Sequence, residues 1–232
     1  MGGPYGRVGA VIAAAGSSRR MGGLDKLQAP LGERPLLAYP LLAFDSSPLV
    51  DAAVLVVAPH SLEWAQGLLR ALGLRKPWRL CEGGQRRQDS VRLGLEALGP
   101  CDWALVHDGA RPLVTPRLIQ DALAAAQATG AAVPALPLTD TVKEVAGERV
   151  LGTLDRSRLR AVQTPQAFRY DLLLAAHRRA RGEATDDAAL VEALGVPVQL
   201  FPGSPHNLKV TTPADLELAR ALVASGVWQH DA

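Results

Sequence analysis

The stretch AVIAAAGSSRRMGGLDK, residues 10–26, starts with an apolar run typical of a buried strand and continues as a loop. Side-chain bulk disappears over residues 13–16, and the loop then carries three cations, Arg19, Arg20 and Lys26. Backbone N–H groups that no large side chain covers can form an anion nest, and several cations together can hold several phosphates. The stretch therefore predicts a strand that ends in a binding loop for a nucleoside triphosphate.

Two common phosphate-binding loops do not match this stretch. No GxxxxGKS or GxxxxGKT sequence follows the strand, and Ser18 stands where a GxGxxG pattern requires glycine. The second mismatch argues against an NAD-binding oxidoreductase. A solvated basic turn is the simpler alternative, but it does not explain why small residues precede the cations.

Composition sets wider limits on the function. A chain of 232 residues with 48% hydrophobic and 21% charged residues is typical of a globular protein, here expected as a single domain over residues 1–232. A formal net charge of +2 gives no basic field that would favour nucleic acid as a partner. Cys81 and Cys101 are too few for a disulfide framework or a tetrahedral metal site. No apolar run approaches membrane-spanning length and residues 1–9 lack a signal-peptide core, so we expect a cytoplasmic protein without membrane contact.

Short apolar runs alternate with helical patterns along the chain. The expected strands are Val8–Ala13, Ala53–Ala58, Trp103–His107, Ala131–Leu136 and Val198–Phe201. The expected helices are about Leu36–Phe44, Ser61–Leu72, Gln88–Leu98, Pro116–Ala128, Tyr170–Arg181, Asp186–Leu194 and Pro213–Ala224. Runs such as AAVLVVA lack polar alternation, as in strands that helices cover on both faces. The pattern predicts an α/β fold of the Rossmann-like, doubly wound kind with a mostly parallel sheet.

Residues 137–165, PLTDTVKEVAGERVLGTLDRSRLRAVQTP, interrupt this alternation. Charged residues alternate with Val and Leu on both sides of a turn near Gly147, which is typical of a β-hairpin. A hairpin that cannot bury both faces on its own domain usually packs against a partner chain. The residues alone leave two alternatives open, a surface excursion and an arm that contacts a second chain.

Ligands of parallel α/β sheets bind beyond the carboxyl ends of the strands. Asp108 directly follows the strand WALVH, in the segment HDGARP, and a carboxylate at this place can hold Mg²⁺ between phosphate oxygens. One such carboxylate suffices, because Mg²⁺ prefers one or two carboxylates together with substrate phosphates. The alternative role of Asp108 is to form the turn before Gly109. His107 is expected to be structural.

The segment GGQRRQDSV, residues 83–91, predicts a glycine turn that leads into a helix. Asp89 or Ser90 could cap that helix, which would account for both residues. Gly83 and Gly84 instead suggest the close approach of backbone to a flat group such as a nucleobase.

The segment HNLKVTTPADLELA, residues 206–219, contains a good helix start at Thr212, with Asp215 in the first turn. That structural role leaves Lys209 unexplained. Only four of the 25 basic residues are lysines, and two of them are Lys26 and Lys209. A lysine presents a compact point charge where an arginine presents a fork, so lysine at both positions suggests that a compact charge is required there.

Together these segments resemble the 2-C-methyl-D-erythritol 4-phosphate cytidylyltransferase family. The resemblance rests on AAAGSSRRM…DK, GGQRRQDSV, VHDGARP, TDTVKEV, LDR, QTPQAF, TDDAALVEALG and NLKVT, in this order, and spans about Val8 to Val223. No single segment is decisive, but the ordered set is highly specific. The resemblance implies a fold of the nucleotide-diphospho-sugar transferase type, with the hairpin as an arm that reaches the active site of the other subunit in a homodimer.

The resemblance also implies a reaction and the residues that support it. The enzyme would join methylerythritol phosphate to CTP and release pyrophosphate, in non-mevalonate isoprenoid biosynthesis, with Mg²⁺ as cofactor and Asp108 as its ligand. Arg20, Lys26 and Lys209 would be catalytic. The nucleotide would lie against Ala14, Ala15, Gly16, Gly84 and Ser90. Methylerythritol phosphate would contact Arg111, Thr141, Arg156, Thr164 and Thr185.

Two alternatives remain beside this interpretation. A cytidylyltransferase of the same fold that acts on ribitol phosphate or a related polyol phosphate would share the nucleotide segments and differ at the acceptor residues. A CTP-sensing domain without catalysis would keep the loop cations but could lose Asp108, Arg156 or Lys209. All three residues are present, which favours an enzyme.

Overall fold

The computed structural model describes residues 4–16 and 25–227. Its centre is an eight-stranded sheet with the order β10-β7-β11-β6-β1-β4-β5, in which β12 pairs with the other side of β7. The strands are β1 Val8–Ala14, β4 Ala52–Val57, β5 Trp78–Glu82, β6 Trp103–Asp108, β7 Ala131–Pro137, β10 Arg160–Val162, β11 Gln166–Arg169 and β12 Gln199–Pro202. β5, β4, β1 and β6 pair in parallel, whereas β11 runs antiparallel between β6 and β7. The predicted α/β fold with a mostly parallel sheet is confirmed.

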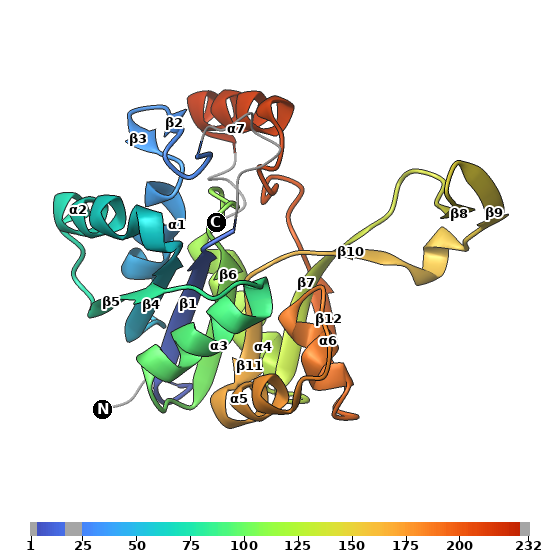
Figure 1. Ribbon diagram of the computed structural model, residues 1–232, viewed down its shortest axis with the longest axis horizontal. Coiled ribbons are helices and arrows are strands. Elements are labelled where there is room, and N and C mark those ends of the chain that lie inside the picture. The colour runs from blue at the N-terminus through green and yellow to red at the C-terminus, as the bar shows by residue number, and fades with distance from the viewer. Residues whose placement is uncertain (1–3, 17–24, 228–232) are drawn as a thin grey trace.

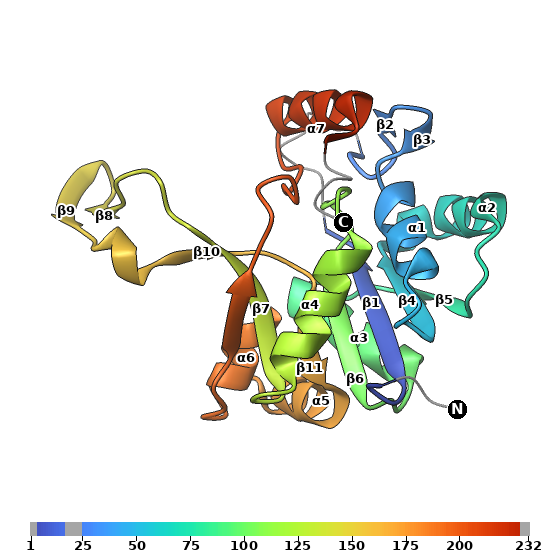
Figure 2. The ribbon, with the colours of Figure 1, turned by 180° about the vertical axis from the view of Figure 1, so that it is seen from behind.

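Helices cover both faces of the sheet (Figures 1 and 2). They are α1 Ala38–Ser46, α2 Leu62–Leu72, α3 Arg87–Leu98, α4 Pro116–Ala126, α5 Tyr170–Arg179, α6 Asp187–Glu192 and α7 Pro213–Ser225. Alternate side chains of each central strand point to opposite faces. Ile12 and Leu55 belong to the core under α1, α2 and α4, and Val11 and Val54 to the core under α3, α5 and α6. This two-sided burial explains why the strand sequences lack polar alternation.

All the expected helices and strands are present, with ends that differ by at most two residues. Three strands of the sheet were not predicted, namely β5, β10 and β11. β5 is an edge strand with two exposed residues among its five, so its sequence, WRLCE, carries no continuous apolar signal. β11 has only four residues, and tertiary pairing between β6 and β7 rather than length makes it a strand.

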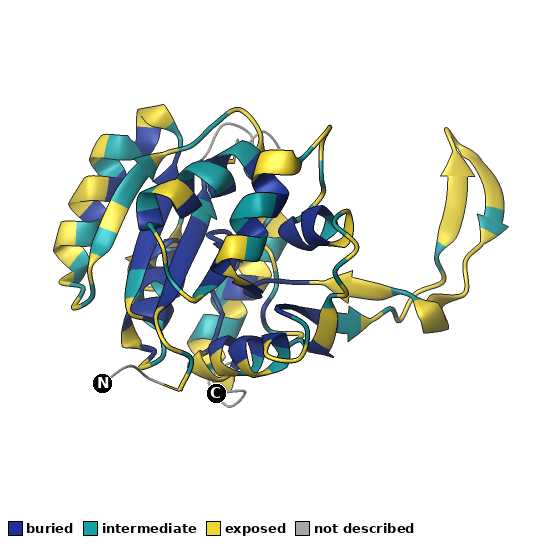
Figure 3. Cartoon of the chain, turned by 90° about the horizontal axis from the view of Figure 1, so that it is seen from below, coloured by how far each residue is buried: buried dark blue, intermediate teal, exposed yellow. Residues whose placement is uncertain are grey.

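The excursion between β7 and β11 forms the predicted hairpin, which extends away from the body (Figure 1). β8 Lys143–Ala146 pairs antiparallel with β9 Arg149–Thr153, and Gly147 in the turn has a φ of +58°, a conformation that favours glycine. The short helix η3 Arg156–Arg158 and β10 then return the chain to β7. Figure 3 shows this arm exposed along both its strands. Val145, Val150 and Leu151 are each more than half exposed.

The β2–β3 hairpin and α7 lie beyond one end of the sheet (Figure 1). β2 Pro30–Leu31 and β3 Arg34–Pro35 form this short hairpin, against which α7 packs. Arg220 of α7 donates a hydrogen bond to the carbonyl of Pro30 at 3.1 Å. Among the residues that the structure describes, no helix is long and apolar enough to cross a membrane.

Gly94 brings α3 into close contact with the sheet. A methyl group added at this residue would lie 2.6 Å from Cγ1 of Val11 and 2.7 Å from Cγ2 of Val56. We expect Gly94→Ala to lower the free energy of unfolding by roughly 1 kcal/mol or more, since overpacking outweighs the gain in helix propensity. Urea denaturation measures the effect. Gly67→Ala in α2 should be stabilising, because an added methyl group there would meet no atom within 4 Å beyond the backbone of its own helix; equal effects of the two substitutions would contradict the packing argument.

Candidate active site

A cavity of about 360 Å³ lies at the carboxyl ends of β1 and β6. It brings together the four segments that the sequence analysis selected. Its lining includes Ala14, Ala15, Gly16, Lys26, Gly84, Ser90, Asp108 and Lys209. The structure therefore assembles, in one cavity, the residues predicted for the nucleotide, the predicted metal ligand and two of the three predicted catalytic cations. The third, Arg20, lies outside the described residues.

The wall predicted for the nucleotide is built from backbone and small side chains. Ala15 packs so closely against Gly83 that a methyl group there would lie 2.3 Å from the Ala15 Cβ atom. The N–H of Gly84 donates to Oγ of Ser90 at 3.1 Å, so the serine fixes the glycine turn. Asp89 accepts a hydrogen bond from the N–H of Arg86, the residue before α3, at 3.3 Å. Asp89 rather than Ser90 therefore caps this helix.

Asp108 is the centre of charge in the cavity. Its Oδ1 atom accepts from Nε of Arg87 at 3.1 Å, and its Oδ2 atom is 2.7 Å from Nζ of Lys209 and 3.9 Å from Nε of Arg111. Burial opposes the charged form of this carboxyl, but Arg87 and Lys209 outweigh burial and hold its pKa well below the ordinary value. Asp108 is therefore ionised at neutral pH, with one oxygen fixed by Arg87 and the other turned to Lys209.

His107 is structural, as expected. The ring is fully buried, with its two nitrogens 3.0 Å from the carbonyl oxygen of Arg111 and 3.0 Å from Oγ1 of Thr164. Burial lowers its pKa to about 4. A neutral imidazole at physiological pH adds no charge beside Asp108.

Lys209 reaches the cavity from a segment outside the sheet. The N–H of Val210 donates to the carbonyl of Ala110 at 2.8 Å, which ties this segment to the loop after β6. Asn207 is fully buried; its Nδ2 donates to the carbonyl of Thr164 at 2.7 Å, and its own carbonyl accepts from Nη1 of Arg111 at 2.8 Å. These contacts hold the backbone on which Lys209 stands.

The five residues predicted for methylerythritol phosphate do not lie together in the described chain. Arg111 and Thr164 are buried beside Asp108, where the Thr164 hydroxyl accepts from the N–H of Asp108 at 3.0 Å. Thr185 is exposed in the loop before α6, at a separate cavity. Thr141 and Arg156 are exposed on the arm, and Arg156 donates to the carbonyl of Thr139. The acceptor site stays a prediction, and the arm residues would reach a cavity only in another subunit.

Sequence reasoning missed three residues that support Asp108, namely Arg87, Asp187 and His177. Arg87 lines the cavity and also contacts Asp187 of α6, whose second oxygen contacts His177 of α5. Arg87 and Asp187 stand inside the quoted segments GGQRRQDSV and TDDAALVEALG. No local pattern relates two side chains that are 100 positions apart, so their pairing has no signal in the sequence.

The predicted start of α7 at Thr212 is confirmed. Oγ1 of Thr212 accepts from the N–H of Asp215 at 3.2 Å, and Oδ2 of Asp215 accepts from the N–H groups of Thr211 and Thr212 at 2.8 Å each. Burial acts to raise the pKa of Asp215, but these hydrogen bonds outweigh it and lower the pKa to about 2. The cap fixes the helix that follows the Lys209 segment.

Replacement of Asp215 tests this cap. We expect Asp215→Asn to lower the free energy of unfolding at pH 7 by about 1 kcal/mol. A carboxyl whose pKa is lower in the folded state stabilises the fold above its unfolded pKa of about 4, and this contribution disappears as the pH falls through about 2. Urea titrations of both proteins should therefore converge between these pH values. Glu217→Gln, an exposed carboxylate on the same helix, is the control; a pH-independent difference would contradict the prediction.

Comparison with known proteins shows which family the chain belongs to. The family model for 2-C-methyl-D-erythritol 4-phosphate cytidylyltransferase matches residues 8–225. A protein of this name from Dehalococcoides mccartyi is 50% identical over 221 residues, which cover 95% of this chain and 97% of the relative. One from Pelotomaculum thermopropionicum is 46% identical over 224 residues, with 94% of each chain covered.

Solved structures match as well. The 2-C-methyl-D-erythritol 4-phosphate cytidylyltransferase of Thermus thermophilus superposes with a TM-score of 0.75 at 39% identity, and the match covers 93% of this chain and 98% of that one. The 4-diphosphocytidyl-2C-methyl-D-erythritol synthase of Anaerococcus prevotii has a TM-score of 0.83 at 28% identity, with 94% and 98% covered. The chain thus belongs to the 2-C-methyl-D-erythritol 4-phosphate cytidylyltransferase family.

Proposed function

We propose that this protein joins 2-C-methyl-D-erythritol 4-phosphate to CTP, giving 4-diphosphocytidyl-2-C-methyl-D-erythritol and pyrophosphate in non-mevalonate isoprenoid biosynthesis. The observation that carries the proposal is the cavity in which Lys26 and Lys209 stand beside Asp108, next to a wall of backbone and small side chains. Cations are available for the phosphates, and the wall has space for a base. Family membership supports this reaction, and in our proposal the reaction takes place in this cavity.

The reaction needs little from the protein beyond position and charge. A phosphate oxygen of methylerythritol phosphate attacks the α-phosphorus of CTP, the new P–O bond forms, and the bond to the β-phosphate breaks so that pyrophosphate leaves with its electron pair. The nucleophile is already an anion at neutral pH, so no general base is required. Charge accumulates on the α-phosphate oxygens, and the barrier falls when fixed cations are aimed at them.

Lys26 and Lys209 are placed to supply that charge. Both side chains line the cavity, and Lys209 is 39% exposed, so its ammonium can exchange Asp108 for a phosphate oxygen without crossing a packed region. Arg20 would add a third cation from the loop after β1. The backbone around Ala14, Gly16 and Gly84 leaves room for the ribose and base.

The cavity also fits a magnesium ion. Among the described residues no group of three or more His, Cys, Asp or Glu side chains could hold a metal by itself, so phosphate oxygens would have to complete the shell around Asp108, as Mg²⁺ prefers. The ammonium of Lys209 at 2.7 Å identifies Oδ2 as an oxygen that accepts a cation from the cavity. Bound there, Mg²⁺ would neutralise phosphate charge and orient the triphosphate.

The arm supports a homodimer with shared active sites. Thr141 and Arg156 do not line the cavity of their own chain, and the hairpin exposes apolar residues that a partner would cover. In this proposal Arg156 of one subunit holds the acceptor phosphate in the other. The protein would act in the cytoplasm.

Removal of Lys209 tests the catalytic role. We expect Lys209→Ala to lower kcat by roughly 10²-fold or more, because a cation aimed at transition-state charge is lost, with a smaller change in KM for CTP. Pyrophosphate release measures both constants. Arg117→Ala removes an exposed cation of α4 that does not line the cavity, and should leave both constants unchanged. A kcat within a few-fold of the parent in Lys209→Ala would contradict the assignment, whereas a parent protein that binds CTP but releases no pyrophosphate would favour a CTP-sensing domain.

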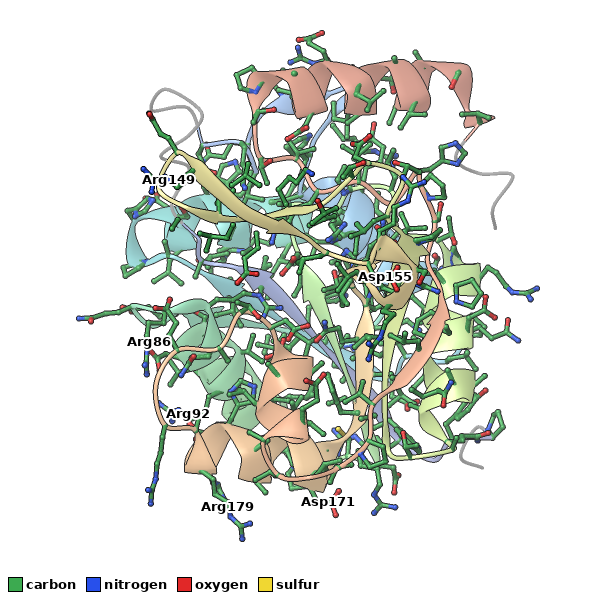
Figure 4. All side chains as sticks on the ribbon, turned by 90° about the vertical axis from the view of Figure 1, so that its right-hand side faces the viewer. Arg86, Arg92, Arg149, Asp155, Asp171 and Arg179 are labelled. Carbon is green, nitrogen blue, oxygen red and sulfur yellow. The ribbon has the colours of Figure 1, made fainter. Side chains whose placement is uncertain are left out.

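Removal of Arg156 tests the arm. We expect Arg156→Ala to weaken use of methylerythritol phosphate while CTP binding, measured by calorimetry, is retained; an equal loss of CTP affinity would contradict the acceptor role. Arg149→Ala, on the outer part of the same arm (Figure 4), is the matched control.

The parent enzyme assayed with ribitol phosphate decides between the two acceptors: turnover with ribitol phosphate alone would favour the alternative polyol.

Mixed dimers test whether Arg156 acts across the interface. Neither Lys209→Ala nor Arg156→Ala homodimers have an intact site. A mixed dimer regains one intact site if the arm serves the other subunit, because that site takes Lys209 from one chain and Arg156 from its partner. Co-refolding of the two impaired variants should therefore raise pyrophosphate release above that of either homodimer. No recovery in verified mixed dimers would show that Arg156 acts in its own chain.

A further inference from the structure

Arg87 joins two carboxylates from distant parts of the chain. It is the first residue of α3; its Nε donates to Oδ1 of Asp108 at 3.1 Å and its Nη1 to Oδ2 of Asp187 at 2.7 Å. A guanidinium has several N–H donors in one rigid plane, so it can hold both carboxylates in a fixed relation. Lysine, with a single ammonium, has no such fork.

Asp187 is held from its other side as well. Its side chain is fully buried, and its Oδ1 atom contacts Nε2 of His177, itself 1% exposed, at 3.0 Å. The contacts therefore run from His177 in α5 through Asp187 in α6 and Arg87 in α3 to Asp108 at the end of β6. Asp187 and His177 do not line the cavity, so neither can touch a nucleotide bound there.

Stability alone is a poor explanation for this arrangement. Removing carboxylates from water costs several kcal/mol, and apolar side chains of similar volume often stabilise a core as well or better. What the contacts do provide is a fixed orientation of the Asp108 carboxylate. Arg87 fixes Oδ1 of Asp108, which stops rotation of the carboxylate and leaves Oδ2 facing Lys209 and the cavity.

We propose that Arg87 is a positioning residue which, anchored by Asp187 and His177, fixes the Asp108 carboxylate with Oδ2 toward the cavity for the divalent cation. The inference rests on the proposed metal role of Asp108. If the anchor is lost, Arg87 can turn to both oxygens of Asp108 and compete with the cation. Asp187 thus acts on the metal only through Arg87.

The test is the factor by which Mg²⁺ strengthens CTP binding, measured by calorimetry with Mg²⁺ and with EDTA. We expect Asp187→Asn to reduce this factor by roughly 10-fold, the usual effect of losing an outer-shell partner of a metal ligand, with the affinity in EDTA little changed. In an Arg87→Met background the same substitution should have no further effect. An equal reduction in both backgrounds would overturn the proposal, because Asp187 would then act independently of Arg87.

Two controls separate this inference from the proposed metal site. Glu96→Gln removes an exposed carboxylate that pairs at 3.0 Å with Arg92 of the same helix, whose side chain points outward in Figure 4, and should leave the Mg²⁺ factor unchanged. Asp108→Asn should abolish it. A reduction in Asp108→Asn without one in Asp187→Asn overturns the positioning role alone; no change in Asp108→Asn overturns the metal site itself.

A second variant carries the test if Asp187→Asn does not fold, as thermal denaturation would show. Arg87→Lys keeps a positive charge at a position whose side chain is 28% exposed but loses the planar fork of donors. We expect a normal melting temperature and a Mg²⁺ factor reduced several-fold, since one ammonium cannot reproduce the two fixed contacts. An unchanged factor in Arg87→Lys would show that charge without geometry suffices, and would overturn the proposal.

Discussion

The buried charge of Asp108 is the constraint on which the rest of this site depends. A carboxylate at the end of a central strand, beside a cavity proposed to bind phosphates, would repel such a ligand if it were not neutralised. Three cations from separate parts of the chain surround it, Arg87 from α3, Arg111 from the loop after β6 and Lys209 from the segment before α7. The contacts of Arg87 and Lys209 join segments far apart in the chain, so most of the charge balance of the site forms only together with the tertiary structure.

The same contacts divide the cations into fixed and movable ones. Arg87 and Arg111 are held by further partners, Asp187 and the carbonyl of Asn207. Lys209 has a flexible stem and a partly exposed ammonium. A site for a triphosphate benefits from this division, because fixed cations keep Asp108 ionised while the movable one is available for the reacting phosphate.

The root of the arm is connected to the backbone of Lys209. Gln163 and Thr164, which follow β10, both bond to the segment before Lys209: Nε2 of Gln163 donates to the carbonyl of Ser204 at 2.9 Å, and the carbonyl of Thr164 accepts from Asn207. Thr164 also accepts from the N–H of Asp108. One short segment therefore braces both the carboxylate and the lysine of its own cavity, while the exposed end of the arm extends away from that cavity.

The sequence by itself determined the elements whose information is local. Apolar runs predicted β1, β4, β6, β7 and β12, a proline and an acid predicted the start of α7, and alternation around a glycine predicted the arm. It also predicted that Asp108 and Lys26 belong to one site, because ligands of parallel sheets bind beyond the carboxyl ends of the strands, and it selected Lys209 by the scarcity of lysine; all three line the cavity. Only the tertiary structure decided the edge strand β5, the short antiparallel β11 and the anchoring of Arg87 by Asp187. These depend on pairing between segments far apart in the chain, and a buried ion pair between residues 100 positions apart leaves no periodicity that a sequence can display.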